Sequence, residues 1–137
     1  MKHLKSQFLL MMAVVITILF SITAFAENGI MPRWDYLIML SADMDVTSYN
    51  AATVHAEVDS DSRDVDTLKV TVKLQQFNGG WKDYKTWTVD VDDSFATIKK
   101  QTAIPKGYSY QIELKAKAYK NGKFLESATE VFDYGFY

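Results

Sequence analysis

The sequence has no cysteine, and only two histidines and two prolines, among its 137 residues. A chain without cysteine can form no disulfide and offers no cysteine for a lipid anchor. It also has few metal ligands, because a zinc site needs three or four converging histidine, cysteine or carboxylate groups. A Ser-His-Asp hydrolase would have to use His55, which lies on the polar side of an alternating pattern with no nucleophile motif present. We therefore predict no catalytic residue, no cofactor and no metal site.

Beyond Lys5 no charged residue occurs until an apolar run has ended at Ala26. Lys2 and Lys5 form a basic start, and Ala24-Phe25-Ala26 places small residues at the two positions that a signal peptidase reads. This pattern is typical of a secretory signal peptide, so we predict that residues 1–26 are removed and that the mature chain is secreted. The alternative is an uncleaved anchor, because the run approaches the ~20 residues that span a bilayer.

The expected mature chain has fewer basic than acidic residues. Residues 1–26 hold two of the 15 basic residues and none of the 17 acidic ones, so residues 27–137 carry a formal charge of −4. A mildly acidic domain is not suited to coating nucleic acid or an anionic membrane. We expect no nucleic-acid partner, and contact with a membrane only through the signal peptide during export. A cysteine-free exported protein of this size fits a Gram-positive bacterium.

Long stretches of the mature chain alternate apolar and polar residues. In one of them Leu68, Val70 and Val72 alternate with Lys69 and Thr71. A period of two over several residues is typical of half-buried strands with one wet face, as in antiparallel sheets. We predict strands over residues 33–42, 51–58, 66–77, 81–91, 95–103, 108–119 and 124–133.

Turn residues separate these stretches. Asn78-Gly79-Gly80 and Asn121-Gly122 supply the positive φ angles that tight hairpins need, and Pro105-Lys106-Gly107 precedes the sixth stretch. About seven short strands with such spacing indicate an all-β fold, an immunoglobulin-like antiparallel sandwich of two sheets. We expect residues 27–137 to form a single β-sandwich domain.

The segment from Pro105 to Gly122 resembles the sixth-strand signature of fibronectin type III domains. In both, a turn containing proline and glycine precedes a Tyr-X-Tyr strand, then small residues, then a tight turn. The resemblance implies that Tyr108 or Tyr110 is a corner tyrosine.

A second resemblance runs along the whole chain. The matching features are the signal peptide, Pro32-Arg33-Trp34-Asp35-Tyr36, Leu74-Gln75-Gln76, Gly80-Trp81, Trp87, Lys106-Gly107-Tyr108-Ser109-Tyr110, and Gly122 followed by Glu126. In these features the chain resembles a family of small exported proteins of Gram-positive bacteria known as a domain of unknown function. The resemblance implies a single secreted β domain and no assigned activity. The chain departs from the family in its acidic loops and its aromatic C-terminus.

The acidic loop that starts at Asp59 superficially resembles a calcium-binding loop. The EF-hand spacing fails, because Asp64 occupies the glycine position and Val70 stands where the closing glutamate should be. An irregular calcium site remains as the alternative to a solvated loop. It would use Asp59, Asp61 and Asp64, with Asp90, Asp92 or Asp93.

Three aromatic residues lie in the fourth predicted strand. Trp87 shares its parity with Val89 and Val91, so we predict that it packs in the core. Trp81 has the same parity and lies at the hairpin mouth, where we expect it to cap the core. Tyr84 has the opposite parity and is the better surface candidate. Aromatic residues on a sheet surface can stack on the flat apolar face of a sugar ring.

The C-terminus is unusually aromatic, with Phe132, Tyr134, Phe136 and Tyr137 in its last six residues. One interpretation is an edge strand whose tail covers the open end of the sandwich. The other is an interaction tail for a protein, a glycan or a membrane surface, since exposed apolar patches usually have a role.

These observations favour a non-catalytic extracellular binding module for an unknown protein or glycan. The candidate interaction surface comprises Trp81, Tyr84, Tyr134, Phe136 and Tyr137. The alternative is a secreted effector, antibacterial or membrane-active, that uses the aromatic C-terminus. An enzyme is the third and least supported hypothesis, because no nucleophile–base pair is visible in the sequence.

Overall fold

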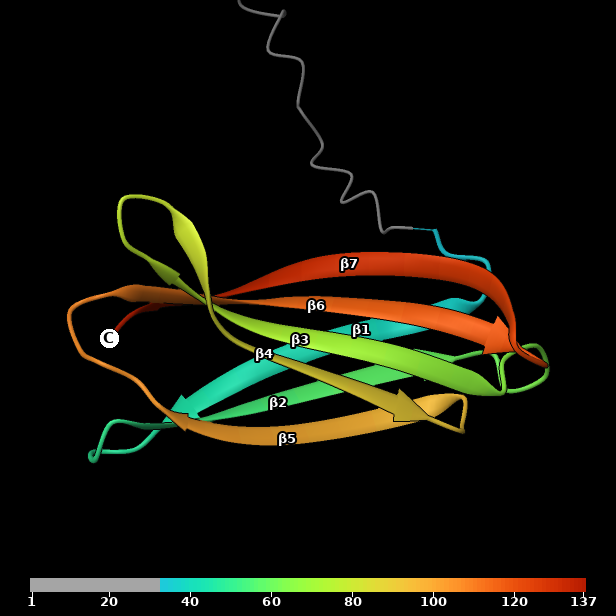
Figure 1. The fold of residues 1–137 in the computed structure, drawn as a ribbon, viewed down its shortest axis with the longest axis horizontal. Helices are drawn as coiled ribbons and strands as arrows, with labels where there is room; N and C mark the ends of the chain where they lie inside the picture. The colour runs from blue at the N-terminus through green and yellow to red at the C-terminus, as the bar shows by residue number, and fades with distance from the viewer. Residues whose placement is uncertain (1–32) are drawn as a thin grey trace, which may run out of the picture. The chain divides into compact units, whose positions relative to one another are not determined.

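A computed structural model describes residues 33–137, and the part from Trp34 to Tyr137 forms one compact unit (Figure 1). Its strands are β1 (Leu37–Val46), β2 (Ala51–Ser60), β3 (Thr67–Phe77), β4 (Trp81–Val91), β5 (Phe95–Ala103), β6 (Ser109–Lys120) and β7 (Lys123–Phe136). None of the described residues lies in a helix that could cross a membrane. The predicted signal peptide, residues 1–26, lies outside the described residues.

The strands form two antiparallel sheets. One has the order β1-β2-β5 and the other the order β4-β3-β6-β7. Alternate residues of the inner strands turn into the space between the sheets, and those of β3 and β6 are almost completely buried. Leucine, valine and isoleucine fill this core without a disulfide. The fold is therefore an all-β sandwich of seven strands in two sheets, as the sequence predicts.

Two of the predicted strands have boundaries that are wrong in an informative way. The first strand runs over Leu37–Val46 rather than residues 33–42, and it begins late because the backbone N–H groups of residues 35–37 donate to the carboxylate of Glu126. The last strand continues to Phe136 rather than ending at residue 133. Asn121 and Gly122 both have positive φ, which confirms the tight turn expected between β6 and β7.

Tyr110 is the corner tyrosine. Its side chain has no exposed surface, and its hydroxyl donates a 2.6 Å hydrogen bond to the carbonyl oxygen of Pro105. The Tyr110 hydroxyl oxygen in turn accepts a 2.9 Å hydrogen bond from Nε2 of Gln76. Burial raises the pKa of Tyr110 above its ordinary value, with the bond from Gln76 acting in the opposite direction. A buried tyrosine at the start of this strand, bonded to backbone a few residues upstream, is the tyrosine corner of immunoglobulin-like sandwiches.

A bulge in β4 changes which face its aromatic residues share. Leu74 pairs with Lys85 and Gln75 pairs with Asp83, so Tyr84 is an extra residue without a partner on β3. An extra residue reverses the inward and outward alternation on one side of the bulge. The three aromatic residues of β4 are affected differently.

Trp87 pairs with Val72 and packs half-buried against the core, as the parity predicts. Tyr84 also packs against the core, and its hydroxyl donates to the carbonyl of Ala103 at 2.9 Å, so the expectation of a surface position is wrong. The expectation that Trp81 caps the core is wrong as well, because Trp81 pairs with the exposed Phe77 on the outer face. Both corrections have the same cause, the extra residue in β4.

Candidate functional site

The outer face of the four-stranded sheet carries exposed aromatic residues at one end. Trp81 on β4 lies opposite Phe77 on β3, with the ring centroids 5.4 Å apart and the planes at 71°. Phe136 on β7 lies opposite Ser109 of β6, the residue before Tyr110, and Tyr110 pairs with Gln76, the residue before Phe77. The three aromatic side chains are 41%, 47% and 74% exposed. We call Trp81, Phe77 and Phe136 the aromatic row; neighbouring strands lie about 4.8 Å apart, so it spans roughly 14 Å.

Planar polar groups form the next row of this face. Nε2 of Gln111 donates to Oε1 of Gln75 at 2.7 Å, and Nε2 of Gln75 donates to Oδ1 of Asp83 at 2.8 Å. The bond from Gln75, together with Lys73, lowers the pKa of Asp83 below its ordinary value. We call Asp83, Gln75 and Gln111 the polar row. Because each member is held by its neighbour, the row presents its remaining donors and acceptors in fixed directions.

A basic groove continues from the polar row along β3 and β6. Its volume is about 410 Å³, and its lining residues are Lys69, Thr71, Lys73, Glu113, Lys115, Lys117 and Thr129. Nζ of Lys73 lies 3.2 Å from Asp83 and 3.3 Å from Glu113, and these bonds raise the pKa of Lys73. Lys69 pairs with Asp90 at 3.6 Å. Within the described part of the chain, Lys115 and Lys117 form no salt bridge.

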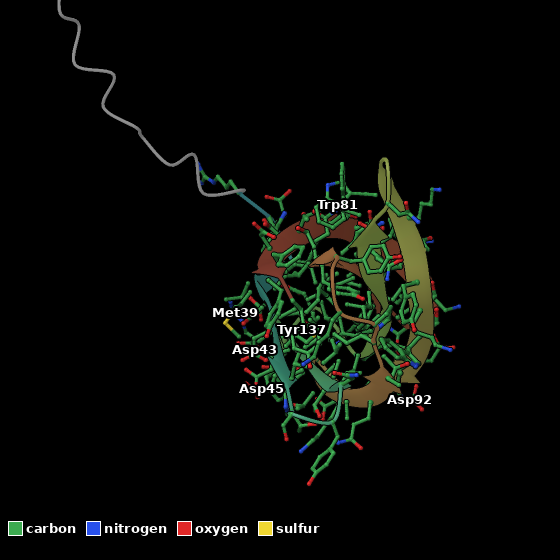
Figure 2. The ribbon with its side chains drawn as sticks, turned by 90° about the vertical axis from the view of Figure 1, so that its left-hand side faces the viewer. Met39, Asp43, Asp45, Trp81, Asp92 and Tyr137 are labelled. Carbon is green, nitrogen blue, oxygen red and sulfur yellow. The ribbon has the colours of Figure 1, made fainter. Side chains whose placement is uncertain are left out.

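The opposite outer face, on the three-stranded sheet, has the opposite charge. A groove of about 380 Å³ is lined by Ser41, Ala42, Asp43, Asp45, His55, Ala56 and Glu57. Figure 2 shows Asp43 and Asp45 projecting from β1 away from the core. Nε2 of His55 lies 3.9 Å from Asp45, and no described serine or threonine hydroxyl is hydrogen-bonded to this histidine. The geometry thus shows His55 as a partly exposed residue beside carboxylates.

The structure does not gather the acidic loop residues into a cation site. The carboxylate of Asp61 accepts bonds from Arg63, at 2.6 Å from Nη2 and 3.0 Å from Nε. Arg63 lowers the pKa of Asp61 to about 2. Among residues 33–137 no group of three or more histidine, aspartate or glutamate side chains could hold a metal ion. Asp59 and Asp64 therefore do not converge with Asp61 on a common point.

The aromatic C-terminus is divided between packing and exposure. The Tyr137 hydroxyl donates to Oδ1 of Asn50 at 2.9 Å, and its backbone pairs with Gly107 and Tyr108. Figure 2 shows Tyr137 between the two sheets at this end of the sandwich, while Trp81 lies at the periphery. Phe136 is exposed on the outer face of edge strand β7.

The predicted interaction residues thus do not form one surface. Trp81 and Phe136 share the outer face of the four-stranded sheet, whereas Tyr84 and Tyr137 pack against the core. Tyr134 is the extra residue of a bulge in β7 and is 39% exposed. Phe77 was not predicted as a site residue. It lies at the end of an alternating strand and shares the parity of its polar residues, and this pattern could have indicated an exposed aromatic side chain.

No family model and no curated protein matches this chain. Among solved structures, it is similar to a calcium-binding mutant of Bacteroides uniformis beta-glucuronidase 2, with 15% identity and a TM-score of 0.41. The same enzyme covalently bound to cyclophellitol-6-carboxylate aziridine matches with 14% identity and a TM-score of 0.41. In both cases the match covers 67% of this chain and 12% of the other chain. This likeness says nothing about what the present chain binds.

Proposed function

We propose that this protein is a secreted, non-catalytic binding module that holds an extracellular glycan on the outer face of its four-stranded sheet. The observation that carries the proposal is the aromatic row lying directly beside the polar row. Three large aromatic residues on one sheet face contribute little to the core, and such exposed apolar surface is usually functional.

The chemistry of the two rows suits a sugar. The flat aromatic faces offer stacking surface for the apolar face of a sugar ring. The amide of Gln111 and the carboxylate of Asp83 offer donors and acceptors to ring hydroxyls, and the buried amide of Gln75 holds the two in place. Their mutual hydrogen bonds, at 2.7 and 2.8 Å, fix these groups before a ligand arrives. Preorganised groups on a rigid sheet lose less entropy on binding than mobile ones.

A glycan is favoured over the effector hypothesis by the state of the C-terminus. Tyr137 is bonded at the end of the sandwich to Asn50, Gly107 and Tyr108, so the tail is part of the fold rather than a free segment. Secretion rests on the signal-peptide pattern of residues 1–26, which predicts a mature chain beginning at Glu27.

The experiment compares binding by the wild type and by Trp81→Ala and Phe77→Ala, measured by affinity electrophoresis against soluble polysaccharides and by pull-down with purified bacterial cell walls. We expect each substitution to weaken binding at least tenfold, since loss of a stacking aromatic removes about 1.4 kcal/mol or more. Thermal melting should change little, because both residues are exposed.

The matched control is Phe95→Ala. Phe95 is 45% exposed, similar to the other two, but it begins β5 in the other sheet. Its substitution should leave glycan binding unchanged. Equal losses for Phe95→Ala and Trp81→Ala, or no loss for any variant, would contradict the proposed face.

A further inference from the structure

The basic groove beside the polar row is the strongest feature that glycan stacking leaves unexplained. Its lining holds four lysines and one glutamate, a formal charge of +3, and Asp90 and Asp83 beside the lining pair with Lys69 and Lys73. The complete sequence carries a formal charge of −2, so this groove has the opposite sign to the molecule as a whole. Positive charge concentrated along two neighbouring strands of an acidic protein attracts anions locally.

The cross-strand register adds a second observation. Lys117 on β6 lies directly opposite Lys69 on β3, and like charges in this position destabilise a sheet. Asp90 on β4 offsets part of this repulsion through its 3.6 Å pair with Lys69, whereas Lys117 faces Ser127 on its other side and has no carboxylate partner on β7. A bound anion would relieve the remaining repulsion.

Lys115 also has no acidic cross-strand partner. Its cross-strand partners are Thr71 on β3, whose hydroxyl shares a 3.2 Å hydrogen bond with that of Thr88, and Thr129 on β7, whose hydroxyl can donate to an anion. Both threonines line the groove, together with Lys115 itself. Lysine ammonium groups and threonine hydroxyls around one groove form a donor-rich site for carboxylate or phosphate oxygens.

We propose that the basic groove binds the negatively charged groups of an acidic glycan whose sugar rings stack on the aromatic row. This inference rests on the proposed function and names its ligand class. Ser109 and Lys115 lie six positions apart on β6, roughly 20 Å along an extended strand. The ligand is therefore a linear chain of several sugars that runs along β3 and β6, with repeated anionic substituents.

The test uses a pair of polymers that differ only in charge. Polygalacturonate carries a carboxylate on each sugar, and its fully methyl-esterified form has the same backbone without the charge. We expect the wild type to bind polygalacturonate at least tenfold more tightly, with an affinity that falls as salt is raised. Polyglycerol phosphate is run alongside, and whichever of the two anionic polymers binds more tightly identifies carboxylate or phosphate as the natural substituent.

The variant is Lys115→Gln/Lys117→Gln, which removes the charge and keeps a polar side chain that is one atom shorter. We expect it to lose the preference for the acidic polymer while binding the methyl ester as the wild type does. Its melting temperature should be unchanged or raised, because the repulsion between Lys117 and Lys69 is gone. The control is Lys99→Gln/Lys100→Gln on β5, which should bind like the wild type.

The outcomes separate the two proposals. Trp81-dependent binding of both polymers with equal affinity overturns the acidic preference and leaves the glycan-binding face standing. Binding of neither polymer, nor of polyglycerol phosphate, overturns the acidic-glycan inference. Single-stranded DNA bound as tightly as the acidic polymers would also overturn it, since the groove would then select charge alone. Equal losses of affinity for the acidic polymer in the two lysine double variants would show a non-specific charge effect. That result would overturn the inference that the basic groove is the binding site.

Discussion

At the residue scale, the hydroxyl of Tyr110 connects three parts of the chain. It donates to Pro105 in the connection before β6 and accepts from Gln76 near the end of β3. Since the side chain is completely buried, water cannot replace either partner. One oxygen atom therefore holds the β5–β6 connection against the end of the four-stranded sheet.

Replacing Tyr110 by phenylalanine should lower the free energy of unfolding by about 1–3 kcal/mol, because the ring stays while a buried carbonyl and an amide lose their partner. Urea denaturation of the wild type and the variant measures this difference. Tyr108→Phe is the control, since its hydroxyl makes no hydrogen bond with another described residue. If both variants lost the same amount, the corner bond would not be the cause.

At the element scale, the bulge in β4 determines both the edge of the core and the candidate site. It directs Tyr84 towards Tyr110, with ring centroids 6.4 Å apart, and turns Trp81 outward beside Phe77. Without the extra residue, the two side chains would exchange faces. The aromatic row therefore exists because of this one irregularity in strand pairing.

The bulge predicts an order of stabilities that a regular strand would reverse. Tyr84→Ala should cost about 2 kcal/mol, because it removes a half-buried ring and the hydrogen bond to Ala103. Trp81→Ala should cost under about 1 kcal/mol despite its larger ring, because Trp81 is exposed on the outer face. Denaturant unfolding of both variants gives the order, and a larger loss for Trp81→Ala would place the bulge elsewhere.

The sequence predicts most of this fold for a simple physical reason. Each strand has one buried face, so its apolar residues repeat with a period of two, and turns with asparagine and glycine divide the strands. The fourth and fifth strands, residues 81–91 and 95–103, are predicted with the boundaries that the structure has. Tyr110 is likewise one of the two tyrosines that the resemblance to fibronectin type III domains implies.

The candidate site could not be predicted from the sequence as well as the fold, because it depends on the register between strands. No glycine marks the bulge at Tyr84, so period-two reasoning carries the wrong parity from Trp87 to Trp81. Lys69 and Lys117 look like ordinary solvated residues in their own strands. Only the pairing of β3 with β6 places them opposite each other in one groove.

At the scale of the whole molecule, the sandwich presents opposite charges on its two outer faces. Carboxylates line the groove on the three-stranded sheet, whereas lysines line the groove on the four-stranded sheet. This separation lets an acidic protein approach an anionic polymer with one face and repel it with the other. This charge separation favours one orientation of the protein, with its four-stranded sheet towards the polymer.

The two sheets are joined at one edge by Glu126. Its carboxylate on β7 accepts hydrogen bonds of 2.9–3.0 Å from the backbone N–H groups of Asp35, Tyr36 and Leu37, where the chain enters β1 of the other sheet. Burial alone would raise the pKa of Glu126, but the three bonds outweigh it and lower the pKa below the ordinary value of 4.5. The charged carboxylate is therefore more stable in the folded protein than in the unfolded chain.

A carboxylate with a lowered folded pKa stabilises the protein above its unfolded pKa and loses that contribution as pH falls through the folded value. Glu126→Gln should accordingly lower the free energy of unfolding by about 1.5–3 kcal/mol at pH 7, where charged hydrogen bonds are lost. The difference from the wild type should shrink below about pH 4.5, as Glu126 of the wild type becomes protonated. Glu130→Gln, on the same strand but without a hydrogen bond to another described residue, should show no such dependence. Urea denaturation from pH 7 down to pH 3 measures both variants, and a difference that stays constant over this range would mean that shape, not charge, holds the entry to β1.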